Sequence, residues 1–241
     1  MHGFTAPIAG RVVIIVTAVL LAQAVLPASA NAAAYLPGID VSHWQGAIDW
    51  RSVANAGYKF GVAKATEGRT YNDPTYGANK KGATAAGLKF TGYHFAHPDT
   101  TTNDAVAEAD HFLSVASLRS GNLIPALDME DSGGLGTEAL ISWTLRWLEE
   151  VRTRLGVRAT IYSGPSFWKT HMGNTTLFAD RGYKLWIAHY GVSSPSVPAN
   201  NWGGRGWTFW QWTDCKTVNG IKGCVDADRY NGTDLSRVSI P

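Results

Sequence analysis

The feature that most constrains the fold of this chain is a repeated alternation of short apolar runs with longer amphipathic segments. Strand-like runs are expected at residues 38–41, 59–65, 90–96, 123–130, 159–163, 184–190, 207–213 and 223–226. Helical spacing predicts helices at residues 47–57, 76–86, 104–118 and 137–155, with a helical turn at 166–172. Repeated strand–helix units are typical of a parallel sheet, and eight strands of this kind predict a closed barrel.

The helix signal weakens after Tyr162, where glycine, proline and serine take over the segments between strands. We therefore predict an α/β fold, an irregular TIM-like β/α barrel of eight strands with fewer helices in its second half. An open doubly wound sheet is the alternative. The chain contains neither G-x-G-x-x-G nor a P-loop pattern, so the sequence does not support nucleotide binding.

The first 34 residues have the pattern of a secretory signal peptide and short leader. Arg11 precedes an apolar run over residues 12–26, and Ala28-Ser29-Ala30 follows as an A-x-A cleavage site. The apolar run is short for a transmembrane helix, and no other segment is long and apolar enough. We therefore expect a secreted, extracellular protein without stable membrane association, and one catalytic domain over residues 35–241.

The cysteines bear on disulfide formation, and the net charge bears on the possible binding partners. Cys215 and Cys224 are the two cysteines, and in an exported chain we expect them to form a disulfide; free thiols would fit a cytosolic protein. The formal net charge of +2 is too small to indicate nucleic acid binding. No pair of cysteine and histidine clusters has zinc-finger spacing, and we expect no metal. We also expect no cofactor and a monomer.

The run from Ile124 to Asp131 is predicted to be a buried strand that ends in acid. Because side chains alternate along a strand, Asp128 and Glu130 should point to one face, with Leu127 on the other. Repulsion and partial burial should then keep one carboxyl protonated beside an ionised neighbour. Glycosidic bond cleavage needs such a pair. Salt bridges or a metal site at the strand end are the alternatives.

Other predicted strands also end in acids and aromatic residues. Asp40, Glu67 and Asp226 fall at strand ends, where barrel enzymes carry their active sites. Aromatic and polar residues join them at Tyr93, His94, Tyr162, Trp186, His189, Tyr190, Trp210, Gln211 and Trp212. Any one of these acids is equally a simple hydrogen-bond acceptor, and any one aromatic a core residue. Together at one rim, they predict a cleft for a saccharide.

These residues resemble those of the family 25 glycoside hydrolases, the N-acetylmuramidases of the Chalaropsis type. The matching segments run in family order from about Leu36 to Gly232. They are GIDVSHWQG (38–46), KATEG (64–68), GYHF (92–95), LDME (127–130), IYS (161–163), LWIAHY (185–190), WQW (210–212) and VD (225–226).

The resemblance implies a metal-free barrel lysozyme that hydrolyses the β-1,4 bond between N-acetylmuramic acid and N-acetylglucosamine in peptidoglycan glycan strands. Glu130 would be the general acid and Asp128 its partner carboxylate, with Asp40 and Asp226 on the cleft floor. Residues that would contact sugars are Tyr93, Tyr162, Trp186 and Trp210, with Tyr190 and Glu67 at the same rim. A second acid, Asp228, leaves the last acidic position open.

The stereochemical outcome and the preferred type of cell wall are not defined by the sequence. Two other functions compete with the muramidase. One is a non-catalytic module that binds peptidoglycan through the same cleft. The other is a hydrolase of another N-acetylated polysaccharide such as chitin.

Overall fold

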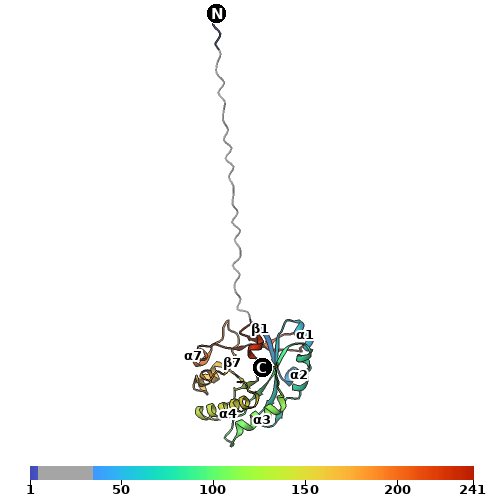
Figure 1. Cartoon of the computed structure of the whole chain (residues 1–241), viewed down its shortest axis with the longest axis vertical. Coiled ribbons are helices and arrows are strands. Elements are labelled where there is room, and N and C mark those ends of the chain that lie inside the picture. The colour runs from blue at the N-terminus through green and yellow to red at the C-terminus, as the bar shows by residue number, and fades with distance from the viewer. Residues whose placement is uncertain (5–34) are drawn as a thin grey trace. The chain divides into compact units, whose positions relative to one another are not determined.

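The computed structural model describes residues 1–4 and 35–241, and all its helices and strands lie within 35–241 (Figure 1). Apart from its first four residues, the predicted signal peptide and leader lie outside the described residues.

Eight strands close into a mixed barrel, which confirms the predicted fold class. The order around the barrel is β1-β9-β8-β7-β6-β5-β4-β2, and β2 pairs with β1 to close it. A two-residue strand, β3, extends β2 as an antiparallel partner. The strands are β1 (Leu36–Val41), β2 (Phe60–Glu67), β3 (Tyr71–Asn72), β4 (Lys89–Phe95), β5 (Ala126–Asp128), β6 (Thr160–Ser163), β7 (Lys184–Ala188), β8 (Phe209–Lys216) and β9 (Val225–Tyr230).

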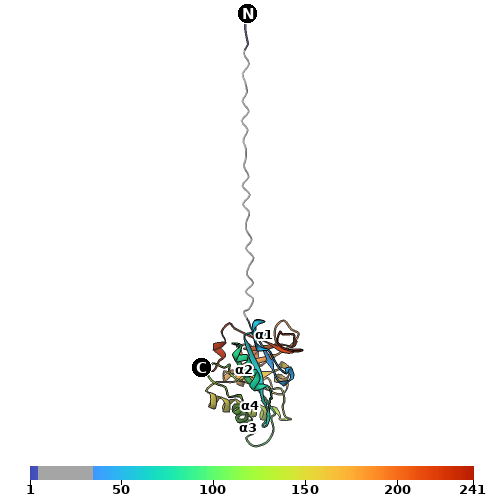
Figure 2. The same cartoon turned by 90° about the vertical axis from the view of Figure 1, so that its right-hand side faces the viewer.

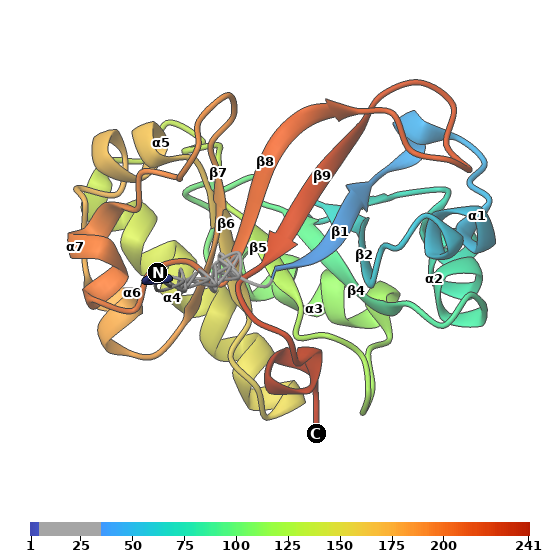
Figure 3. The ribbon, with the colours of Figure 1, turned by 90° about the horizontal axis from the view of Figure 1, so that it is seen from above.

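The expectation of an entirely parallel barrel is wrong for the last strand. β9 runs antiparallel to both of its neighbours, β1 and β8, and lies beside them in Figure 3. A short loop joins β8 to β9, and a loop of this length permits only a hairpin, because a parallel crossover needs a dozen or more residues. The start of β9, and not its end, therefore reaches the rim at which the parallel strands end. Asp226 stands there, opposite Asp40 of β1.

The helices that the periodicity of the sequence predicts pack on the outside of the strands (Figures 1 and 2). They are α1 (Trp50–Asn55), α2 (Tyr76–Ala85), α3 (Asp104–Ala116), α4 (Thr137–Leu155) and α5 (Pro165–Thr170). The buried face of α4 includes Trp143 and Trp147, as their helical spacing predicts. Gly156 ends α4 with a left-handed φ of 71°.

Four short helical segments lack a periodic signal in the sequence. They are the 3₁₀ turns η1 (His43–Gln45) and η2 (Leu235–Val238) and the helices α6 (Leu177–Asp180) and α7 (Pro198–Gly203). In α7, residues 199–202 have φ values between 52° and 55°, so this segment is a left-handed turn. Left-handed backbone is uncommon outside glycine, and a pattern search for right-handed helices therefore fails there.

One end of the barrel is sealed by apolar side chains. Phe60 and Phe209, at the starts of β2 and β8, pack with residues of the C-terminal segment such as Val238. Backbone hydrogen bonds from Ile124 to Val238 and from Ile240 to Asn122 hold this segment in place. Polar side chains that point into the barrel are therefore concentrated at the opposite end, where the parallel strands terminate.

Candidate active site

A cleft of about 210 Å³ opens at the carboxyl ends of the parallel strands. All eight barrel strands contribute to its wall directly, and Ser42 and Trp44 extend it just beyond β1. The lining residues are Asp40, Ser42, Trp44, Lys64, Tyr93, Phe95, Asp128, Glu130, Tyr162, Trp186, Gln211 and Asp226. The fold thus brings together the four acids that the sequence nominated as catalytic.

Asp128 and Glu130 point into this cleft from the end of β5, as strand alternation predicts. Leu127 precedes Asp128, and Met129 lies between the two acids. Both apolar side chains are fully buried on the other side of the strand. Asp128 is 7% exposed and Glu130 is open to solvent, so the two carboxyls lie at different depths. The backbone N–H of Met129 donates to Tyr162 O at 2.9 Å, which holds the chain extended beyond Asp128.

The surroundings of this pair favour neutral carboxyls. Burial raises the pKa of Asp128 well above its usual value, and the charges of Glu130 and Asp40 add to the effect. Burial against the cleft wall also raises the pKa of Glu130, while the Lys64 ammonium opposes the rise. Burial of both groups, together with the Glu130 charge beside Asp128, therefore makes this pair easier to protonate than two isolated carboxyls. Oδ1 of Asp128 is buried and has no hydrogen-bond partner among the described residues, which further disfavours the ionised carboxylate.

Asp40 and Asp226 form the second acidic pair, on the cleft floor. They face each other across β1 and β9. Burial raises the pKa of Asp40 well above its usual value, and the Asp228 charge adds to it. Burial and the Asp40 charge raise the pKa of Asp226 to about 8. Gln211 Nε2 donates to Asp40 Oδ2 at 2.7 Å, which favours the ionised form of Asp40.

The structure distinguishes the positions of Asp226 and Asp228 in the site, which the sequence left open. Asp226 lines the cleft, whereas Asp228 is 1% exposed and lies deeper in the barrel. Its Oδ1 accepts a hydrogen bond of 2.8 Å from Trp186 Nε1. Burial raises the pKa of Asp228 to about 8. Asp228 therefore holds the indole of Trp186 in the wall, and Asp226 is the acid that a substrate can reach.

Three of the nominated aromatic residues, Tyr93, Tyr162 and Trp186, line the cleft. The Tyr162 and Trp186 rings pack edge to face at 4.9 Å between centroids. The Tyr162 hydroxyl donates to Gln211 Oε1 at 2.9 Å, and the Tyr190 hydroxyl donates to the same oxygen. Tyr190 stands outside the lining set but is 41% exposed next to it.

Trp210 requires a correction, because it does not face the cleft. It is 1% exposed, and its Nε1 donates to His189 O at 2.8 Å. Successive side chains on β8 alternate, so with Gln211 pointing into the barrel Trp210 must point outward. There the Arg229 guanidinium lies 4.8 Å from the centre of its ring. Strand alternation around Gln211 was the signal that would have placed it correctly.

Glu67 also lies outside the set of cleft-lining residues, contrary to its nomination as a substrate contact. It forms an ion pair with Lys64 and accepts a hydrogen bond of 2.7 Å from His97 Nε2. Burial alone would raise the pKa of Glu67, but the hydrogen bonds from Lys64 and His97 lower it below its usual value. Glu67 therefore anchors Lys64, which does line the cleft and which the sequence reading missed. A lysine within a buried apolar strand was the available signal.

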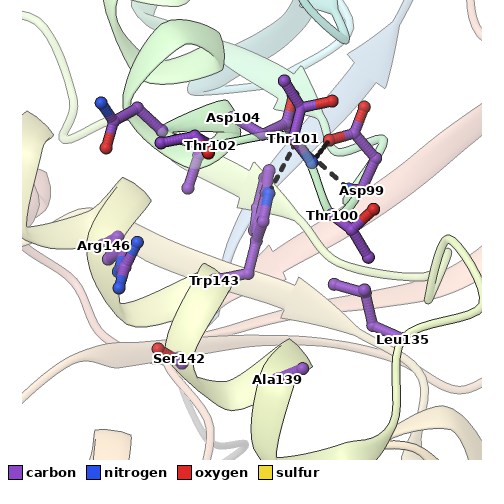
Figure 4. Close-up of a pocket in the computed structure, with 12 residues that line it drawn as sticks. Asp99, Thr100, Thr101, Thr102, Asp104, Leu135, Ala139, Ser142, Trp143 and Arg146 are labelled. Carbon is purple, nitrogen blue, oxygen red and sulfur yellow. Dashed lines mark hydrogen bonds between the residues drawn. The ribbon is translucent and has the colours of Figure 1, made fainter.

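A larger cavity, of about 410 Å³, lies between residues 99–105 and the first turns of α4 (Figure 4). Its buried acid, Asp104, accepts hydrogen bonds from Trp143 Nε1 at 2.8 Å and from the Asp99 backbone at 3.2 Å. Arg69 Nε lies 3.4 Å from its other oxygen. This carboxylate is held by contacts that fasten α3 to α4, so the cavity lacks a free acid for chemistry.

Three further features bear on the expectations from sequence. Cys215 and Cys224 form the predicted disulfide across the base of the loop between β8 and β9. Within the described part of the chain, no cluster of three or more His, Cys, Asp or Glu side chains is arranged to hold a metal ion. None of the described helices combines the length and apolar character needed to cross a membrane.

Fold and site together define a barrel glycoside hydrolase: a closed β/α barrel with buried carboxylates and aromatic walls in a cleft at the strand ends. The sequence model for "Glycosyl hydrolases family 25" matches residues 39–221, and the chain belongs to this family.

Relatives of known name agree with this assignment. The chain is 38% identical to "Lysozyme M1" of Streptomyces globisporus over 205 residues, covering 81% of this chain and 68% of that one. It is 31% identical to the "N,O-diacetylmuramidase" of Chalaropsis sp, covering 78% and 95%. The crystal structure of the bacterial lysozyme from Streptomyces coelicolor superposes with a TM-score of 0.80 at 35% identity, covering 86% of this chain and 97% of the other.

Proposed function

We propose that this protein is a secreted muramidase that hydrolyses the β-1,4 bond between N-acetylmuramic acid and N-acetylglucosamine in bacterial peptidoglycan. The observation that supports it best is the projection of Asp128 and Glu130 into one aromatic-walled cleft. The names of the relatives, lysozyme and N,O-diacetylmuramidase, support the choice of substrate.

In this proposal Glu130 is the general acid. The leaving oxygen needs a proton as the glycosidic bond breaks, and a carboxyl with a raised pKa holds one near neutral pH. Glu130 is the more exposed member of the pair, so its proton lies where an incoming glycan strand can reach it. Its raised pKa is consistent with this role.

Asp128 is the partner carboxylate. An acetamido N–H of the substrate, donated to the Asp128 carboxylate in the cleft, would favour ionisation of Asp128 and leave the proton of the pair on Glu130. The ionised Asp128 then stabilises the positive charge that develops at the sugar, either directly or by orienting the acetamido group to assist. Asp40 and Asp226 supply further negative potential from the floor.

Substitution of Glu130 by Gln tests this assignment. Loss of a general acid lowers a rate by about 10²–10⁴-fold, and Glu130→Gln should lower the rate of clearing of a cell-wall suspension by that factor. Asp131→Asn is the matched control, because Asp131 is adjacent in sequence, contacts His97 at 3.4 Å and lies outside the cleft. A Glu130→Gln variant that clears walls at the wild-type rate would remove Glu130 from this role.

Product analysis separates the competing functions. A non-catalytic binding module would bind peptidoglycan without releasing reducing ends. A chitin-type hydrolase would release more reducing ends from chitin than from peptidoglycan. Mass spectrometry of fragments from purified peptidoglycan should show N-acetylmuramic acid at the new reducing end if the proposal is right.

A further inference from the structure

An exposed tryptophan, Trp44, lies at the rim of the cleft. Trp44 is 83% exposed, the highest value for any large apolar side chain in residues 35–241. It also lines the cleft with Asp128 and Glu130. A large apolar ring left in water at the edge of a binding cleft suggests a surface that a ligand covers.

The backbone under Trp44 is fixed by a capping box around η1. The Ser42 hydroxyl accepts a hydrogen bond from Trp44 N at 3.3 Å, and Ser42 N donates to Gln45 Oε1 at 2.9 Å. These reciprocal bonds lie entirely within the turn and hold its backbone by themselves. The backbone that carries the ring is therefore already ordered before a sugar arrives.

The ring itself rests on a second aromatic residue. The His43 and Trp44 ring centres are 4.5 Å apart, with 35° between their planes. Asp73, which is 4% exposed, accepts hydrogen bonds from His43 N at 2.9 Å and from Nδ1 at 3.2 Å. The Tyr71 hydroxyl lies 3.2 Å from the same Nδ1. This support restricts the indole and lowers the entropy lost when a ligand stacks on it.

We propose that Trp44, supported by His43, is a stacking platform for a pyranose ring of the glycan strand, next to the sugars held at Asp128 and Glu130. This inference rests on the proposed function and names a further sugar subsite. In a β-1,4-linked hexosamine chair the ring substituents are equatorial, so axial C–H groups make both faces apolar. Such a face complements the electron-rich face of an indole.

The surroundings favour a sugar over a protein partner. Ser42 and Lys64, which line the same cleft, are polar, so the exposed aromatic surface here is limited to Trp44 and the partly exposed Tyr71 beside His43. A stable protein interface needs roughly 800 Å² from each partner, with an apolar centre. A single ring beside acids and hydroxyls matches the alternation of apolar faces and polar edges in a polysaccharide.

The test compares Trp44→Ala and Trp44→Phe with a matched control, Trp212→Ala. Trp212 is also partly exposed, but it lies outside the cleft, where Lys216 packs over its ring. With soluble, uncrosslinked peptidoglycan glycan strands, Trp44→Ala should raise KM about three- to tenfold and leave kcat nearly unchanged. Trp44→Phe should recover most of that loss, and Trp212→Ala should match wild type. Circular dichroism confirms that each variant is folded.

The same variants, made in the Glu130→Gln background, isolate binding from turnover. Calorimetry with the glycan strands should show weaker binding for Trp44→Ala by the same factor. An unchanged KM and an unchanged dissociation constant in Trp44→Ala would overturn the platform even if the enzyme cleaves peptidoglycan. Failure of the wild type to release reducing ends would instead overturn the muramidase function, while the binding comparison would still decide the role of Trp44.

Discussion

Gln211 is predicted to be a main structural support of the cleft, because three cleft hydrogen bonds meet on its side chain. It is 2% exposed, donates to Asp40 and accepts from the hydroxyls of Tyr162 and Tyr190. Substitution by leucine keeps a similar volume and removes all three bonds. Asp40 and Tyr162 are 6% and 7% exposed at the cleft wall and have little access to water, whereas Tyr190 is 41% exposed and can bond to water instead.

The expected loss follows from the two buried partners. Each buried polar group left without a hydrogen bond costs about 1–3 kcal/mol, so Gln211→Leu should lower the free energy of unfolding by about 2–6 kcal/mol. For a domain of this size each kcal/mol lowers the melting temperature by about 2–4 °C, which gives a decrease of roughly 5–20 °C. Urea unfolding followed by tryptophan fluorescence measures the free energy directly.

Gln211→Glu is the informative comparison. It retains an acceptor for the two tyrosine hydroxyls but replaces the amide that donates to Asp40 with another acid. We expect it to be destabilised at neutral pH and to recover as the pH falls, when the added carboxyl binds a proton. A Gln211→Leu variant within about 1 kcal/mol of wild type would refute the view that these bonds hold the cleft together.

Two further predictions concern acid stability and export. Burial lowers the pKa of His94 to about 3 and raises the pKa of Glu108 to about 7. Their side chains meet at 2.7 Å. Between these two pKa values the folded pair therefore carries one proton. Between about pH 4.5 and 6.5 the folded and unfolded pairs both carry one proton, so the contribution of this pair to stability should not change with pH there. Below about pH 4.5 the unfolded pair gains a second proton, and stability should fall. Glu108→Gln removes the compensating proton, so in urea titrations stability should begin to fall already below about pH 6.5, and an unmoved onset would contradict the shared proton. Export should leave a mature protein in the culture medium that begins near residues 31–35, and intact-mass measurement of a secreted form that retains residues 1–30 would contradict the signal peptide.

Several features of the site follow from local sequence rules. The sequence predicts a strand over residues 123–130, of which the structure forms β5 at Ala126–Asp128. The alternation of apolar side chains with acids places Asp128 and Glu130 on one face. The helices at 76–85, 104–116 and 137–155 were predictable from their spacing. A parallel barrel then requires strand-end acids to gather at one rim, so most of the cleft could be anticipated.

Other features depend on which strands pair and in which direction. Asp226 and Asp228 share a face of β9, so alternation cannot distinguish them. Only the antiparallel pairing of β9 with β1 places Asp226 opposite Asp40 and buries Asp228 under Trp186. The sequence determined the alternation of polar and apolar side chains along each strand, because it is a property of neighbouring residues. The tertiary structure decided how deep each side chain lies, since depth depends on partners that are distant in the chain.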